Sequence, residues 1–171
     1  EMVSSIQDQT YCANAWEPDV VVTDGNKTLV KNSDYTVSYT DNINAGTAKV
    51  KVTGQGNYKG TAEATFVIDP APSTITGAEV AAKTYDGTKT ATINGVTFGG
   101  LVPGEVLTTD DYQITDAQFN SANVSDAKKV TVTVALKVTD KAKNYTLTSP
   151  TYGQAATISK ATQNISVPQD K

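Results

Sequence analysis

The sequence predicts an all-β chain that forms two tandem, small β-sandwich modules, with single-sheet modules of the β-grasp kind as the alternative. Three observations lead to this prediction. Thr and Val dominate the composition while Leu, Met and Phe are scarce, and β-branched side chains favour the pleated surface of a sheet. Apolar and polar residues alternate along several segments, as they do in half-buried strands. The same series of motifs also occurs twice in the 171 residues.

The repeated motifs set the expected module boundaries. The span from Ile6 to Tyr11 equals the span from Val80 to Tyr85, and both end in Thr-Tyr. Further matched pairs are Asp34-Tyr35 with Asp111-Tyr112, Asn57-Tyr58 with Asn144-Tyr145, and Ala64–Ile68 with Ala155–Ile158. We therefore expect a first module at residues 1–70, a second at 71–160 and, at 161–171, the start of a following module or a linker.

Alternation identifies the clearest strands. The apolar positions of three such segments are Tyr35, Val37 and Tyr39; Ala48, Val50 and Val52; and Val130, Val132, Val134, Leu136 and Val138. Turn-forming pairs separate the segments, among them Asp24-Gly25 and Asp86-Gly87. Asn94-Gly95 lies between Thr92-Ile93 and Val96-Thr97 and predicts a two-residue hairpin turn, because this dipeptide tolerates the positive φ angles that such a turn requires.

Composition limits the functions that the chain can have. The net charge is −4, and the sequence contains neither Arg nor His. A protein that binds nucleic acid needs a basic surface, so nucleic acid is not an expected partner. The lack of His removes the commonest general base and metal ligand, and Cys12 alone can form neither an intrachain disulfide nor a zinc cluster. We expect no enzyme activity, no catalytic residues, no cofactor and no metal.

Hydropathy gives no indication of a membrane segment. No stretch approaches the ~20 apolar residues of a membrane helix. Residues 1–10 lack the basic start and apolar run of a signal peptide. We therefore expect no membrane insertion within this sequence, and any targeting signals of a secreted parent protein would lie outside it.

Two sets of motifs resemble known repeats of bacterial surface proteins. Asp34–Tyr39, Asn44–Ala48 and Gly54–Gly60 lie in the segment 20–68, which resembles an immunoglobulin-like (Ig-like) repeat of cell-surface proteins from gut Firmicutes. The second repeat contains Lys83–Thr88 and Gly100–Glu105 and resembles the YDG/MBG-type repeat of adhesins and filamentous haemagglutinins. These resemblances imply tandem extracellular β-modules, Ig-like in the first repeat, without catalytic residues.

Aromatic and amide side chains recur at matched positions. We expect the rings of Tyr11, Tyr58, Tyr85 and Tyr145 to fill the cores, with each hydroxyl bonded to the backbone. Asn57 and Asn144 are expected to be turn residues and not ligands, since Asn tolerates left-handed geometry.

Trp16 is the one residue that we single out for ligand binding. It has no aromatic counterpart at the matched position, Thr90, and it precedes a strand that opens at Pro18. An exposed indole there could stack on a sugar or on a partner, although isolated surface aromatics are common.

Other candidate sites have simpler interpretations. Asp110, Asp111 and Asp116 lack the spacing of a calcium loop and are better explained as a solvated approach to a strand. Cys12 is expected to be a small, partly buried residue and not a reactive thiol. Whether a Lys-Asn isopeptide bond forms stays open at this point.

The sequence thus favours a non-catalytic stalk or spacer in a larger bacterial cell-surface or secreted adhesin-like protein, outside the cell and attached to its wall or surface. Its partners would be the neighbouring modules of the same chain. The alternative is an adhesion module that recognises a glycan or a host protein.

Overall fold

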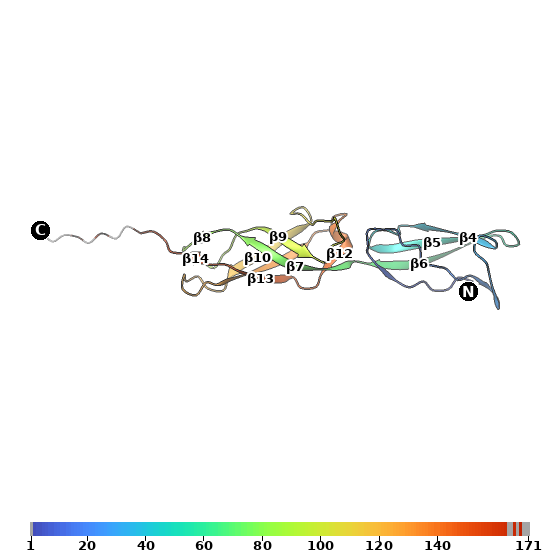
Figure 1. Ribbon diagram of the computed structural model, residues 1–171, viewed down its shortest axis with the longest axis horizontal. Coiled ribbons are helices and arrows are strands. Elements are labelled where there is room, and N and C mark those ends of the chain that lie inside the picture. Colours follow the sequence, from blue (N-terminus) through green and yellow to red (C-terminus); the bar gives the residue numbers. More distant parts are fainter. Residues whose placement is uncertain (1, 164–165, 167, 169–171) are drawn as a thin grey trace. The chain divides into compact units, whose positions relative to one another are not determined.

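The computed structural model describes residues 2–163, 166 and 168, and its regular structure is almost entirely β (Figure 1). The described part of the chain contains no α-helix, only one short 3-10 turn, η1 (Ala142–Asn144). The predicted all-β class is therefore confirmed, and the several sheets are compatible with β-sandwich packing. No helix among the described residues has the length and apolar character needed to cross a membrane.

The chain folds into two compact units. Unit 1 contains the residues up to Ser73 together with 100–105 and 138–146. Unit 2 contains residues 74–99, 106–137 and those from 147 onward. Two segments of the second sequence repeat, including η1, thus belong to unit 1.

Unit 1 is built on one four-stranded sheet. Its strands are β1 (Gln9–Thr10), β6 (Thr61–Asp69), β5 (Gly46–Gly54) and β4 (Tyr35–Thr40), in that spatial order. β5 is antiparallel to both neighbours, whereas β1 is parallel to β6. The predicted alternation in β4 and β5 is confirmed, because Ala48, Val50 and Val52 are buried while the lysines between them are exposed.

A small hairpin completes the regular structure of unit 1. β2 (Thr23–Asp24) pairs antiparallel with β3 (Lys27–Thr28). Gly25 lies between them with a φ of 57°, the left-handed geometry that a glycine adopts without strain. The predicted turn at Asp24-Gly25 is confirmed.

Unit 2 contains three sets of paired strands. The first set is the antiparallel sheet β10 (Tyr112–Phe119), β11 (Lys129–Leu136) and β13 (Thr151–Ala155). In the second, β7 (Ala71–Val80) pairs antiparallel with β9 (Ile93–Gly99), and in the third, β8 (Lys83–Thr84) pairs parallel with β14 (Ile158–Ser159). The remaining strand, β12 (Tyr145–Leu147), directly follows η1, and its first two residues belong to unit 1.

The alternation in β11 is confirmed from Val130 to Val134 but not beyond, because Ala135 and Leu136 are both half-buried. Val130, Val132 and Val134 are buried, whereas Val138 is 97% exposed. The strand ends at Leu136, so the expectation that Val138 faces the core is wrong. Once pairing stops, the chain is free to turn and a period-two pattern no longer fixes which side faces inward.

The hairpin predicted at Asn94-Gly95 is also wrong. β9 runs through both residues. Its register with β7 changes between Glu79↔Gly95 and Val80↔Ile93, so Asn94 is the extra residue of an irregularity in the strand. The positive φ angles that a hairpin turn would need are not adopted at either residue.

The matched motifs occupy equivalent places in the two units. Gln9 pairs with Ile68 in unit 1, and Lys83 pairs with Ile158 in unit 2, both in parallel register. The alignment of 64–68 with 155–158 in the sequence therefore corresponds to a shared strand pairing. The expected following module or linker at 161–171 falls mostly on residues outside the described ones and stays a prediction.

Candidate functional site

Three side chains of unit 1, Tyr11, Glu105 and Tyr145, form a hydrogen-bonded group that we call the Tyr-Glu cluster. Tyr11 directly follows β1, Tyr145 is the first residue of β12, and Glu105 ends a tight turn. Both rings are buried, and they meet edge to face with their centroids 5.6 Å apart.

Local sequence explains the position of Glu105. The amide of Glu105 donates to the carbonyl of Val102 at 3.0 Å, which closes a four-residue turn. Pro103 is the second residue of the turn and Gly104 the third, with a φ of 90°, as a type II turn requires. This turn places the Glu105 carboxylate within hydrogen-bonding distance of the Tyr11 and Tyr145 hydroxyls.

The Glu105 carboxylate accepts a hydrogen bond from each phenol. The Tyr11 hydroxyl donates to Oε1 at 2.7 Å, and the Tyr145 hydroxyl donates to Oε2. The Tyr145 hydroxyl also accepts from the Val102 amide at 2.9 Å. The turn and the two tyrosines thus form one bonded network.

Burial and the nearby carboxylate stabilise both phenols in their protonated form. Burial is the main cause that raises the pKa of Tyr11 to about 12, and the hydrogen bond to Glu105 adds to it. The pKa of Tyr145 is also raised, again mainly by burial and then by Glu105. A tyrosine nucleophile or base would need the opposite shift, so this arrangement suits hydrogen-bond donors.

Asn144 anchors a neighbouring loop. Its Oδ1 accepts from the Ala45 amide at 2.8 Å, and its Nδ2 donates to Asn44 Oδ1 at 3.1 Å and to the Asp140 carbonyl at 3.2 Å. Asn144 is almost fully buried in η1, so the expectation of a simple turn residue misses its main contacts. Asn57, at the matched position in the first repeat, is an exposed turn residue as expected.

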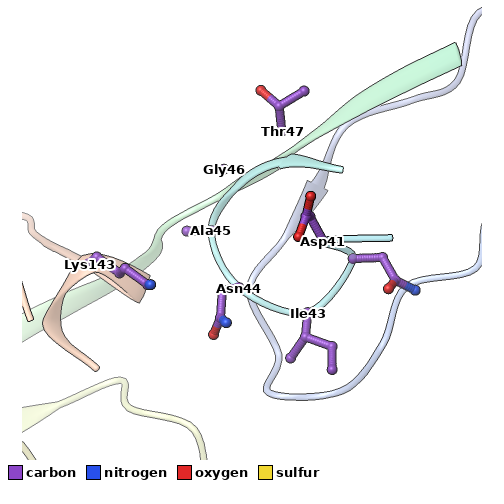
Figure 2. Close-up of a pocket in the computed structure, with 8 residues that line it drawn as sticks. Asp41, Ile43, Asn44, Ala45, Gly46, Thr47 and Lys143 are labelled. Atoms are coloured by element: carbon purple, nitrogen blue, oxygen red, sulfur yellow. The ribbon is translucent and has the colours of Figure 1, made fainter. Parts of the chain in front are cut away.

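The anchored loop borders a pocket of about 360 Å³ (Figure 2). Residues 41–47 and Lys143 line it, and Figure 2 shows Lys143 on the side of Asn44 and Ala45. The pocket offers the carboxylate of Asp41, backbone and amide groups, and the ammonium of Lys143, whose Nζ lies 3.1 Å from Asp140 Oδ1. No aromatic side chain is among its lining residues.

Trp16 supports the same loop from outside the pocket. Its amide donates to the Asn42 carbonyl at 2.8 Å, and its carbonyl accepts from Asn42 Nδ2 at 2.9 Å. The indole Nε1 donates to the Thr10 carbonyl at 2.9 Å, and the side chain is half-buried. The polar groups of Trp16 are therefore used within the fold.

The expected core positions of Tyr58 and Tyr85 are wrong. Tyr85 is 45% exposed, because it follows the last residue of β8, where the chain turns away from the two-stranded pair. Tyr58 is only half-buried, and Lys27 Nζ lies 5.6 Å from the centre of its ring. For Tyr11 and Tyr145 the burial is confirmed. The Tyr145 hydroxyl has the expected backbone partner, the Val102 amide, in addition to Glu105, whereas the Tyr11 hydroxyl donates to the Glu105 carboxylate.

The Tyr85–Thr88 motif forms a turn after β8. Asp86 Oδ1 accepts from the amide and the hydroxyl of Thr88, both at 2.8 Å, and Gly87 has a φ of 78°. These bonds, together with Lys83, lower the pKa of Asp86. The motif therefore shapes the chain, and its acidic residue caps its own turn.

The acidic residues and the cysteine that the sequence offered as site candidates do not form a site among the described residues. Asp111 is buried and accepts from the Thr108 amide at 2.9 Å, so the expected solvated position applies to Asp110 and Asp116 but not to Asp111. Within residues 2–163, no group of three or more acidic or cysteine side chains is placed to hold a metal ion. Cys12 is half-buried, as expected.

Sequence analysis did not single out Glu105 or Lys143. The Pro103-Gly104 turn was the only local signal near Glu105, and nothing in it indicates which side chains the carboxylate meets. Glu105 meets Tyr11 and Tyr145, and Lys143 lines the pocket of residues 41–47. Both placements depend on segments distant in the chain, so no local pattern could have identified them.

Comparison with known proteins gives one match. No curated protein and no solved structure matches the chain. Residues 69–152 match the family model of the YDG domain. This range contains the Tyr85-Asp86-Gly87 turn and the two segments that pack in unit 1. The second repeat is therefore similar to the YDG domain, which confirms the YDG-type resemblance for that part of the chain.

Proposed function

We propose that this chain is a non-catalytic stalk or spacer segment of a larger bacterial surface or secreted adhesin-like protein. The observation that carries this proposal is the use of its distinctive polar side chains within the fold. Tyr11, Glu105 and Tyr145 bond to one another, Asn144 holds a loop, and the Trp16 indole binds the Thr10 carbonyl. Among the described residues, no buried side-chain nitrogen or oxygen lacks a hydrogen-bond partner.

The match to the YDG domain supports an adhesin-like context for the second repeat. We extend the proposal to the first repeat, as an Ig-like module, on the motifs of residues 20–68. The proposed location is outside the cell, attached to the wall or surface, and the proposed partners are neighbouring modules of the same chain. Antibodies against the chain should label intact bacteria of the source strain; labelling only after lysis would contradict the location.

A second candidate function is an adhesion module for a glycan or a host protein. The pocket beside residues 41–47 favours it, because Asp41, Asn44 and Lys143 offer acceptors and a cation to a polar ligand. Trp16 is linked to that loop through Asn42.

Binding measurements separate the two functions. The folded chain would be tested on glycan arrays, on mucin-coated surfaces and on host cells. The stalk proposal predicts no saturable binding in any of these assays. Saturable binding would overturn it and favour the adhesion module. The variants Trp16→Ala and Lys143→Ala, with Tyr85→Ala as an exposed aromatic control in unit 2, would then locate the site.

A further inference from the structure

The parallel strand pair in unit 2 joins an early and a late segment of that unit. β8 pairs with β14 in the register Lys83↔Ile158 and Thr84↔Ser159. The Tyr85 amide extends the pairing by donating to the Ser159 carbonyl at 2.8 Å. Ser159 Oγ donates back to the Lys83 carbonyl at 3.1 Å. Backbone and side-chain bonds thus hold the two strands together.

Both strands are also fixed to the rest of unit 2. Ile158 is buried in the core, so β14 cannot slide without exposing its side chain. Lys83 Nζ donates to the Thr90 carbonyl at 2.6 Å and to Thr88 Oγ1 at 2.8 Å. The pair is therefore anchored on each side.

Direction decides how such a pair responds to force. In a parallel pair the start of one strand and the end of the other lie at opposite ends of the ladder. The chain enters β8 at its start and leaves β14 at its end. Tension applied between these two points pulls the strands past each other, so the hydrogen bonds are strained together and not one after another.

Unit 1 contains the same arrangement. β1 is parallel to β6, with Gln9 opposite Ile68 and Thr10 opposite Asp69. The Tyr11 amide donates to the Asp69 carbonyl at 2.9 Å, as Tyr85 does to Ser159. Asp8 Oδ1 adds a side-chain bond by accepting from the Val67 amide at 2.9 Å.

We infer that each unit carries a shear clamp, a parallel pair of its early and late strands that resists tension along the chain. This inference rests on the proposed function, because a stalk carries force between the segments on either side of it. The equivalent register in both units gives the Thr-Tyr repeat a mechanical role in addition to its role in the fold.

Single-molecule force measurements on the whole chain test the clamp through pulling direction. In a Cys12→Ser background, one variant carries Ala82→Cys and Lys160→Cys, which place the handles at opposite ends of the β8-β14 pair. Its matched control carries Lys89→Cys and Lys160→Cys, which attach both handles to the chain after the end of each strand. The three attachment residues are exposed, so the substitutions leave the core unchanged.

The first pair of handles should shear the strands and the second should peel them apart. We expect the peeling force to be lower by about twofold or more, because bonds worth ~1 kcal/mol each then break in succession. Equal unfolding forces in the two directions would overturn the clamp.

A pair of substitutions at Tyr85 gives an independent readout. Tyr85→Pro removes the amide that bonds to Ser159, whereas Tyr85→Ala removes the exposed ring and keeps the amide. Under shear at a fixed force, the proline variant should unfold roughly 2- to 10-fold faster than the alanine variant, the effect of one lost hydrogen bond. Equal rates would contradict the clamp.

The outcomes distinguish this inference from the function on which it rests. A chain that binds no ligand but unfolds at the same force in both directions would remain a spacer without a clamp. A chain that binds mucin and still resists shear would have a clamp but would not be a passive stalk.

Discussion

The Tyr11 hydroxyl donates to Glu105 Oε1 at 2.7 Å, although 94 residues separate the two in the chain. The same carboxylate accepts from Tyr145, so one glutamate connects the end of β1 with the start of β12. Both buried phenols therefore use this carboxylate as their acceptor.

Glu105→Ala should destabilise unit 1, because it leaves two buried phenols without their acceptor. We expect the free energy of unfolding to fall by about 1–3 kcal/mol, measured by urea denaturation. Glu105→Gln keeps an acceptor oxygen and should cost less. Glu63→Ala, at an exposed position of the same unit, should change stability by no more than ~0.5 kcal/mol. A loss of stability at Glu105 no larger than at Glu63 would contradict the role of the cluster.

The raised pKa of Tyr11 predicts a loss of stability in alkali. The folded chain holds the phenol proton more tightly than the unfolded chain, whose tyrosine has the ordinary value of 10.0. The stabilisation is therefore complete below pH 10 and is lost as the pH rises from 10 towards about 12. Tyrosinate absorbance and urea denaturation at stepped pH measure the two effects, and Tyr11→Phe should remove the corresponding step. Ionisation of Tyr11 at its ordinary pKa would refute this prediction.

Asn144→Ala should release the loop at residues 41–47. The Ala45 amide would lose its acceptor, and we expect a cost of about 1–3 kcal/mol in the free energy of unfolding. Hydrogen exchange at the Ala45 amide should accelerate. Asn57→Ala is the matched control from the first repeat, and its exposed side chain should contribute no more than ~0.5 kcal/mol. Similar effects at the two asparagines would argue against the anchoring role.

Two valines test where the inward-facing pattern of β11 ends. Val132→Ala empties part of a fully buried site and should cost about 1.5–3 kcal/mol. Val138→Ala changes a side chain that is 97% exposed and should have almost no effect on thermal or urea unfolding. A large effect at Val138 would mean that the core extends beyond Leu136.

Local pattern predicted the strands that carry the cores. Ala48, Val50 and Val52 of β5, and Val130, Val132 and Val134 of β11, are buried as their alternation indicates. The prediction from alternation succeeds because a strand places successive side chains on opposite faces of the sheet. One buried residue therefore indicates that its neighbours in the strand point to the opposite face. The matched Thr-Tyr motifs likewise precede equivalent parallel pairings in the two units.

Local pattern failed where a distant segment decides the outcome. Asn94-Gly95 has the composition of a hairpin turn, yet pairing with β7 keeps both residues within β9. Tyr11 and Tyr85 occupy matched positions, but only Tyr11 meets a second ring and a carboxylate from remote segments. A repeated motif therefore does not guarantee a repeated environment.

The sequence alone determined the all-β class and the alternation of buried and exposed residues in the main strands, because both depend on residues close together in the chain. It also carried the similarity of the second repeat to the YDG domain, because a family match reads the order of residues and needs no contacts. The tertiary structure decided that Glu105 joins two tyrosines, that Asn144 holds a loop, and that early and late strands pair in parallel. These contacts join segments tens of residues apart, and only folding brings such segments within hydrogen-bonding distance.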